Sequence, residues 1–260
     1  MSNPSPPRLL VAEDNSVNQK LALAMLQKIG YQADLVSNGK EALDALAKVR
    51  YEAILMDCQM PHMDGYQATG ELRRQEESRG SGHVPIIAMT AAVMEGEKER
   101  CIAAGMDDYL AKPFKLGELE AILRRWVLRE PVPPPGETSE GDESSRPVDP
   151  ARVAELRELT DGTHRDGFTV LAELFVEDAH VRVVSMRQAI DRDDAVGVGR
   201  EAHALKGSAA NVGAVKLAQT CGDLEDVASS GNLAEGHRLL TRVEAEFLRV
   251  DDFLREQLRK

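Results

Sequence analysis

The chain has few aromatic residues, few cysteines and no long apolar run. Phe, Trp and Tyr make up 4% of its 260 residues, so its hydrophobic cores must consist mainly of aliphatic side chains and alanine. The three cysteines, Cys58, Cys101 and Cys221, form no CxxC pair, which argues against a structural zinc site and is typical of reduced thiols in the cytoplasm. No run of about 18 apolar residues is present, and the N-terminal MSNPSPPRLLVAEDN is too polar for a signal peptide, so we expect a cytoplasmic protein without a membrane partner.

Positive charge is also in deficit. The chain has 32 Lys and Arg residues against 44 Asp and Glu residues, and its formal net charge is −12. Proteins that bind nucleic acids non-specifically neutralise phosphates with Lys and Arg, so this balance argues against a nucleic-acid partner. The length fits about two domains, and a hydrophobic content of 42% is enough to build their cores.

Five short apolar runs alternate with segments of helical periodicity in the first half of the chain. Two of the runs, LLVA and AILM, are almost continuously apolar, as in strands that are buried on both faces. Strands that alternate with helices predict a parallel sheet, and therefore an α/β doubly wound fold. The expected strands are 8–14, 31–37, 51–57, 84–90 and 107–114, and the expected helices are 16–29, 39–49, 64–78, 94–104 and 116–129.

The second half has a different pattern. Residues 129–150 are rich in Pro, Gly, Ser and acidic residues and indicate a flexible linker, after which no strand pattern appears. Asp149 and Pro150 have the residue types of a helix N-cap and a first helical position. Helical segments with short connections predict an all-α antiparallel bundle, and they are 151–160, 166–190, 194–211, 213–229 and 232–258. We therefore expect a first domain at 1–129, a linker at 130–148 and a helical domain at 149–260.

Polar residues stand at the ends of four of the five expected strands. Because parallel strands end at one edge of the sheet, where open α/β sheets bind ligands, these residues should lie close together: Glu13, Asp14, Asp57, Thr90 and Lys112. Carboxylates gathered in this way repel each other unless a hard cation such as Mg²⁺ neutralises them. With Lys112 and Thr90 opposite the metal, the cluster would suit a phosphoryl group bonded to a carboxylate, and Asp57 on the central strand is the candidate nucleophile.

The same segments resemble a response-regulator receiver domain. AEDN, LMDCQMPHMDG, AMTA and AKPF match the family's motifs in order and spacing, and EDNSVN and DCQMPHMDG resemble receivers of hybrid sensor kinases more than those joined to DNA-binding domains. The resemblance implies a flavodoxin-like sheet of strand order 2-1-3-4-5, a cis peptide bond before Pro113 and bound Mg²⁺. By position it implies that Glu13 and Asp14 bind the metal, that Asp57 is the phosphoacceptor and a further metal ligand, and that Gln59 lends its backbone carbonyl to the metal. It also implies that Thr90 and Lys112 bind the phosphoryl oxygens and that Thr90 and Tyr109 form a conformational switch.

The stretch HALKGSAANVG carries the second candidate site. In a helix, His203, Lys206 and Gly207 lie on a stripe beside the apolar stripe that faces the bundle, so the imidazole should be reachable. A neutral imidazole can act as a nucleophile, a lysine one turn away can stabilise a phosphoryl group, and a glycine would let a partner approach closely. The motif resembles that of histidine phosphotransfer (HPt) domains, which implies that His203 is a phosphoacceptor supported by Lys206, Gly207 and Ser208.

Together these features predict a two-component phosphorelay intermediate. Asp57 would receive a phosphoryl group from an upstream sensor histidine kinase, and His203 would exchange one with a downstream response regulator receiver. No glycine-rich nucleotide-binding loop is present, so we expect no ATP-dependent kinase activity. Two alternatives stay open at this point: a phosphorylation-controlled interaction switch without transfer between Asp57 and His203, and a C-terminal part of a hybrid histidine kinase.

Overall fold

The computed structural model describes residues 6–80, 82–90, 97–130, 147–160 and 167–259. The chain divides into two compact units, Met1–Ser139 and Glu140–Lys260, and each is considered by itself. Most of the predicted linker, residues 131–146, lies outside the described residues, as do the first residues of the predicted helices 94–104 and 166–190.

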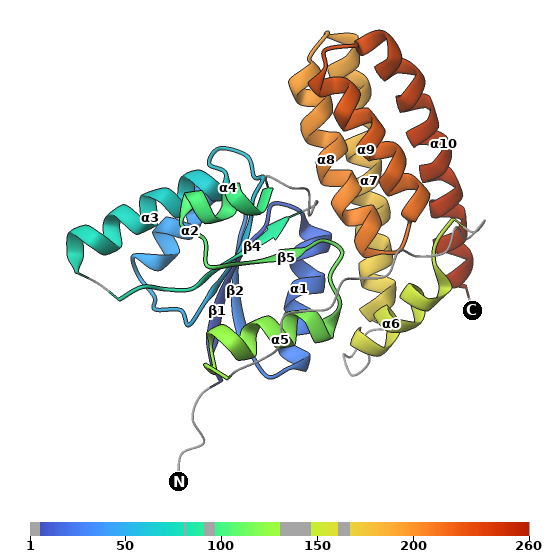
Figure 1. Cartoon of the computed structure of the whole chain (residues 1–260). Coiled ribbons are helices and arrows are strands. Elements are labelled where there is room, and N and C mark those ends of the chain that lie inside the picture. Colours follow the sequence, from blue (N-terminus) through green and yellow to red (C-terminus); the bar gives the residue numbers. More distant parts are fainter. Residues whose placement is uncertain (1–5, 81, 91–96, 131–146, 161–166, 260) are drawn as a thin grey trace. The chain divides into compact units, whose positions relative to one another are not determined.

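The first unit is a three-layer α/β structure built on a five-stranded sheet (Figure 1). Its elements are β1 (Arg8–Ala12), α1 (Ser16–Lys28), β2 (Gln32–Val36), α2 (Gly39–Leu46), β3 (Ile54–Asp57), α3 (Gly65–Arg79), β4 (Ile86–Thr90), α4 (Glu97–Ala104), β5 (Asp108–Ala111) and α5 (Leu116–Trp126). The strand order is β2-β1-β3-β4-β5, and every neighbouring pair is parallel. Helices α1 and α5 cover one face of the sheet, and α2, α3 and α4 cover the other. These observations confirm the predicted doubly wound fold and its 2-1-3-4-5 order.

The three central strands form the core of this unit. Every residue of β3 and β4 is buried, and in β1 only Arg8 is exposed, whereas the edge strand β2 has no buried residue. The buried side chains are mainly Leu, Ile, Val, Met and Ala, as the low aromatic content requires. Each fully buried Leu or Ile contributes about 1.5–3 kcal/mol to folding, so a shift in register would be costly. The carboxyl ends of β1, β3 and β4 are therefore held together at one edge.

Two local features fix the loops at that edge. Asn15 follows the acidic pair directly, and its side chain accepts hydrogen bonds from two backbone N–H groups in the first turn of α1. A cap of this kind stabilises a helix by about 1 kcal/mol. At the start of α3, a Cβ atom on Gly65 would lie 2.2 Å from the carbonyl oxygen of Asp57, so only glycine fits there. The backbones around Asp14 and Asp57 are thus set by neighbouring residues.

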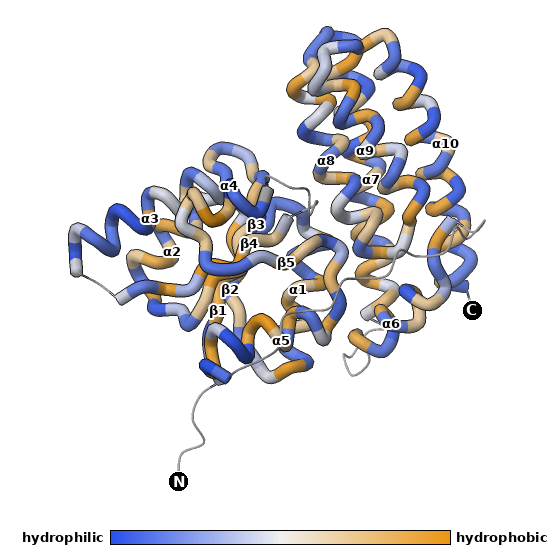
Figure 2. The backbone as a smooth tube through the Cα atoms, in the orientation of Figure 1, coloured by the Kyte–Doolittle hydropathy of each residue, from blue (hydrophilic) through white to orange (hydrophobic). Residues whose placement is uncertain are grey.

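The second unit is helical. Its elements are α6 (Pro150–Thr160), α7 (Gly167–Asp191), α8 (Ala195–Asn211), α9 (Val215–Ser229) and α10 (Leu233–Gln257). Helix α8 packs against α7 and α9, and α10 packs against α9 and α7, which closes a four-helix bundle. Figure 2 shows hydrophobic and hydrophilic residues alternating around these helices, as an amphipathic bundle requires. The predicted helical bundle is confirmed, and within the described residues no helix is both long and apolar enough to cross a membrane.

Asp149 and the residues beside it hold the start of the bundle in place. Asp149 caps α6, because its Oδ1 accepts a hydrogen bond from the N–H of Ala151 at 2.9 Å. The N–H of Asp149 donates to the carbonyl of Gly213, which has the predicted positive φ, 83°, after α8. Val148, which we assigned to the linker, is fully buried. A single apolar residue between proline and aspartate has no periodicity, so the sequence pattern could not reveal this packing.

Candidate functional site

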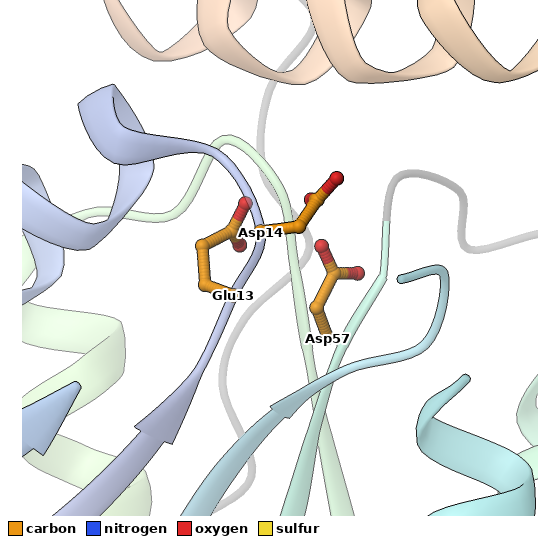
Figure 3. A group of neighbouring side chains, drawn as sticks. All are labelled: Glu13, Asp14 and Asp57. Atoms are coloured by element: carbon orange, nitrogen blue, oxygen red, sulfur yellow. The ribbon is translucent and has the colours of Figure 1, made fainter. Parts of the chain in front are cut away.

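Three carboxylates meet where β1 and β3 end (Figure 3). Glu13 and Asp14 follow β1, Asp57 ends β3, and one oxygen from each side chain lies within 4.8 Å of the others. Glu13 and Asp57 are buried and Asp14 is partly exposed. In the part of the chain that the structure describes, this is the only cluster of three His, Cys, Asp or Glu side chains with such spacing. Its donors are all carboxylate oxygens, so it fits a hard divalent cation.

Lys112 inserts into this cluster from the end of β5. Its Nζ donates to Glu13 Oε2 at 2.5 Å and to Asp57 Oδ2 at 2.7 Å, and its side chain is only 5% exposed. Burial alone would lower the pKa of the Lys112 ammonium, but the two carboxylates outweigh burial and raise it. The peptide bond between Lys112 and Pro113 is cis, as expected from the resemblance. Lys112 is therefore a fixed positive charge between two of the three acidic residues.

Glu13 is held by residues that the sequence analysis did not single out. Asn18 Nδ2 donates to Glu13 Oε1 at 2.8 Å, and the N–H of Asn15 donates to the same oxygen at 3.3 Å. Burial raises the pKa of Glu13 to about 7, against the opposing effects of Lys112 and Asn18. The EDNSVN stretch offered a usable signal, because Asn15 has the residue type of a helix N-cap and Asn18 lies one turn later, where its side chain can reach back to the preceding strand end.

The three other predicted receiver residues lie in different places. Thr90 ends β4, is buried, and accepts a hydrogen bond on its carbonyl from the N–H of Lys112 at 2.7 Å. The N–H of Gln59 donates to Asp57 Oδ1 at 3.2 Å, while its side chain is exposed. Tyr109 lies within β5, half-buried, with Lys98 Nζ of α4 5.5 Å from its ring centroid. Thr90 and Gln59 thus reach the edge with the acidic residues, and Tyr109 lies beside α4.

His203 belongs to a second cluster, formed with Lys206 of the same helix and Glu225 of α9. His203 Nδ1 lies 2.8 Å from Glu225 Oε1, and Lys206 Nζ lies 3.3 Å from Glu225 Oε2. Burial alone would raise the pKa of Glu225, but His203 and Lys206 outweigh burial and lower it. Because a carboxylate can only accept hydrogen bonds, Nδ1 carries a proton, and a neutral ring of this tautomer keeps its lone pair on Nε2.

Gly207 and Ser208 are not placed as we expected. Both are buried, so Gly207 is not an open position on the surface of α8, and that expectation was wrong. The Ser208 hydroxyl donates within its own helix, to the carbonyls of Ala204 and Leu205. Helix α8 packs against both α7 and α9, so its buried arc is wider than a single apolar stripe. The structure therefore brings Lys206 to His203 but not the Ser208 hydroxyl.

Glu225 is the site residue that the sequence analysis missed. It lies 22 positions after His203 on another helix, and its neighbours Asp223 and Asp226 are exposed acids of the same helix. Which of these three acids faces α8 depends on the register between α8 and α9, which side-chain packing sets. A single sequence gives no direct signal for that register.

Models of two protein families match the chain. The response regulator receiver domain matches residues 9–124, and the Hpt domain matches residues 170–253. The chain carries a receiver domain followed by an Hpt domain. This pair indicates two-component phosphorelay signalling.

The curated relatives of the chain include hybrid histidine kinases and sensor proteins. The chain is 45% identical over 129 residues to hybrid signal transduction histidine kinase I of Dictyostelium discoideum, covering 48% of this chain and 7% of the relative. It is 38% identical over 130 residues to the sensor protein GacS of Pseudomonas syringae pv. syringae, and this match covers 49% of this chain and 14% of GacS. The chain spans between 6% and 15% of the length of such relatives.

Solved structures also match about half of the chain each. The receiver domain of the sensor histidine kinase PA1611 from Pseudomonas aeruginosa PAO1, which was crystallised with a magnesium ion in its active site cleft, is 51% identical with a TM-score of 0.43, over 47% of this chain and 98% of that one. A chain from the complex of the Saccharomyces cerevisiae histidine phosphotransfer protein Ypd1 with the Ssk1 receiver domain matches at 29% identity and a TM-score of 0.46. This match covers 49% of this chain and 92% of that one.

Proposed function

We propose that the chain is a phosphorelay intermediate in which Asp57 receives a phosphoryl group and His203 carries one. The observation that supports this most strongly is a lysine held beside each proposed acceptor: Lys112 Nζ lies 2.7 Å from Asp57 Oδ2, and Lys206 binds the carboxylate that binds His203. The receiver would comprise residues 1–129, the linker 130–148 and the HPt domain 149–260. The partners would be an upstream sensor histidine kinase and a downstream response regulator receiver.

At Asp57, a carboxylate oxygen would attack the phosphorus atom of a kinase phosphohistidine. The new O–P bond forms as the N–P bond breaks, and the leaving imidazole nitrogen keeps the electron pair and takes up a proton. Glu13, Asp14 and Asp57, with the backbone carbonyl of Gln59, would hold Mg²⁺, which when bound neutralises charge on the phosphoryl oxygens. The three converging carboxylates fit such an ion.

Lys112 and Thr90 would bind the transferred group on its other side. Lys112 is already fixed at Asp57, so it needs no rearrangement to contact a phosphoryl oxygen. A phosphoryl group adds strong acceptor oxygens, which would draw the Thr90 hydroxyl toward Asp57. Tyr109 would then turn from its place beside Lys98 and change the surface near α4.

At His203, the lone pair of Nε2 would attack the phosphorus of a partner's aspartyl phosphate. The N–P bond forms as the acyl O–P bond breaks, and the released carboxylate keeps the electron pair. Glu225 would hold the Nδ1 proton and stabilise the positive charge that develops on the ring, while Lys206 would contact the phosphoryl oxygens. Gly207 and Ser208 would contribute only through the packing of α8.

Labelling with acetyl phosphate tests this function. Aspartyl phosphate is labile in base and phosphohistidine is labile in acid, so the two products can be separated. We expect base-labile label that disappears with Asp57→Asn or with EDTA and persists with Asp44→Asn, which changes an exposed acid of α2. Undiminished label in Asp57→Asn would refute the assignment of the acceptor.

Mixing two variants tests transfer. Phosphorylated His203→Gln chains should pass label to Asp57→Asn chains, where it becomes base-stable. Label that stays on Asp57 in this mixture and also in the wild-type chain would support the interaction switch instead.

A further inference from the structure

A groove lined by arginines lies at the edge of the receiver sheet opposite the acidic residues. It has a volume of about 570 Å³ and is formed by the residues just before β3 and β4 and by the C-terminal ends of α2, α3 and α5. Because β3 and β4 begin at this edge and end at Asp57 and Thr90, the groove is one strand length away from the phosphorylation edge. Its volume lies in the range of about 300–1,000 Å³ that is typical of small-molecule sites.

The lining has an excess of unneutralised positive charge. Arg50, Arg79 and Arg129 line the groove and are exposed, and none of them has an ion-pair partner among the residues that the structure describes. Two carboxylates line the groove, and one of them, Glu76, already forms an ion pair with Arg73 of α3 at 2.6 Å. Glu52 is therefore the one lining carboxylate left to balance the three guanidinium groups. In a chain with a net charge of −12, such a gathering of arginines favours an anionic ligand.

Two aromatic residues also line the groove. Trp126 Nε1 donates to Asp108 Oδ2 at 2.8 Å, and the Tyr51 hydroxyl donates to Asp34 Oδ2 at 2.5 Å. Their polar atoms are therefore occupied. Tyr51 is buried and Trp126 is partly exposed, so the ring surface that a ligand can reach is mainly that of Trp126. A ring surface binds a planar group, and guanidinium groups bind phosphates in a bidentate manner.

We infer that this groove binds an anionic aromatic metabolite of the nucleotide class, with its phosphates on the arginines and its base against Trp126. Asp57 is not among the lining residues, so the ligand is not a phosphodonor for it. The inference does not depend on the proposed phosphotransfer, because it rests on residues at the other edge of the sheet.

Trp126 is the only tryptophan of the chain, so its fluorescence reports on this groove alone. The 260-residue chain is titrated in EDTA with ATP, adenosine and pyrophosphate, with excitation of the tryptophan, and calorimetry provides a second readout. EDTA prevents the acidic residues near Asp57 from recruiting a metal–nucleotide complex. We expect saturable binding of ATP with a dissociation constant below about 1 mM, at least tenfold weaker binding of pyrophosphate, and none of adenosine.

Substitutions locate the site. Arg50→Gln, Arg79→Gln and Arg129→Gln should each weaken ATP binding roughly fivefold, the strength of an exposed ion pair, and the triple variant should abolish it. Arg74→Gln, an exposed arginine of α3 that pairs with Glu71 outside the groove, should bind as the wild type does. Circular dichroism verifies that the triple variant is folded. The inference is overturned if ATP does not bind, if pyrophosphate binds equally well, or if the folded triple variant retains wild-type affinity.

Discussion

Replacing Glu225 with alanine should change which nitrogen of His203 carries the proton. In the structure, Glu225 accepts from Nδ1 at 2.8 Å and is ionised at neutral pH, because His203 and Lys206 lower its pKa against the effect of burial. Without that carboxylate, the N–H at Nδ1 loses the acceptor that Glu225 provides. The neutral ring can then exchange between the form with its proton on Nδ1 and the form with its proton on Nε2. The alanine variant should therefore have a smaller population with the proton on Nδ1.

The size of this change follows from the hydrogen bond. A hydrogen bond to a charged group contributes about 1.5–3 kcal/mol, and with His203 16% and Glu225 20% exposed there is little screening by solvent. Since 1.4 kcal/mol is a factor of ten, Glu225 should favour the Nδ1-protonated form by about tenfold to a hundredfold. In Glu225→Gln the amide oxygen can still accept, but a neutral hydrogen bond of about 0.5–1.5 kcal/mol leaves a bias of only about twofold to tenfold.

The effect on transfer should be much smaller than the effect on the protonation ratio. Loss of the bias lowers the reactive fraction from nearly all molecules to about half, so this mechanism alone slows phosphoryl acceptance only about twofold. Any larger loss measures the separate contribution of Glu225 to ring orientation and charge.

Nitrogen chemical shifts of the labelled His203 ring measure the ratio directly, at about pH 8 where an ordinary imidazole is neutral. Asp226→Ala, which removes the exposed acid next to Glu225, serves as the control and should leave the ratio unchanged. An unchanged ratio in Glu225→Ala would refute the reasoning.

Three further changes test the electrostatics and the backbone. Lys112→Ala leaves two buried carboxylates unpaired, so in EDTA it should lower the free energy of unfolding of the receiver domain by about 3–5 kcal/mol in urea titrations, whereas exposed Lys115→Ala should change it little. The pKa of Glu13 is raised from 4.5 to about 7, so between these pH values the folded receiver binds more protons than the unfolded chain. Its free energy of unfolding in EDTA should therefore fall as pH rises from 4.5 to about 7. If Glu13→Gln shows the same fall with pH as the wild type, this prediction is wrong. Gly213→Ala should lower the melting temperature of the Hpt domain, because φ is +83° and the new Cβ would lie 2.8 Å from an arginine side chain, while Gly236→Ala, with only ordinary contacts, should not.

The placement of the receiver residues could be predicted because, in a parallel sheet, the position of a residue at a strand end determines which edge of the sheet it occupies. Each polar residue after a buried strand reaches the same edge of the sheet, so Glu13, Asp57 and Lys112 come together across up to 99 positions of chain. The apolar pattern fixes which residues lie in strands, and strand ends then fix the edge. The strand order came from the resemblance, because periodicity alone does not say which strand pairs with which. The roles of these residues stay predictions.

The bundle was less predictable for a physical reason. A helical wheel gives the angle of each side chain on its own helix, but not the partner that faces it. On α8 the wheel placed His203 and Lys206 together, as observed, whereas Gly207 is buried in a helix that packs against two others. Glu225 depends on how α9 slides along α8, which is decided by interdigitating side chains rather than by residue spacing.

The two lysines beside the proposed acceptors differ in a way that matters for a relay. Lys112 is 5% exposed and bridges two carboxylates, whereas Lys206 is 30% exposed and contacts one. If Asp57 is phosphorylated, Lys112 stays in place, because the negative charge on the phosphoryl oxygens of the acyl phosphate replaces the carboxylate charge that it neutralised before. If His203 is phosphorylated, the new charge of about −1.5 to −2 competes with Glu225 for the ammonium of Lys206. That competition weakens the hold on the phosphohistidine, so removing it with Glu225→Gln should lengthen the lifetime of the phosphohistidine in the presence of a receiver. A shortened lifetime would show that Glu225 stabilises the phosphorylated ring more than it competes for Lys206.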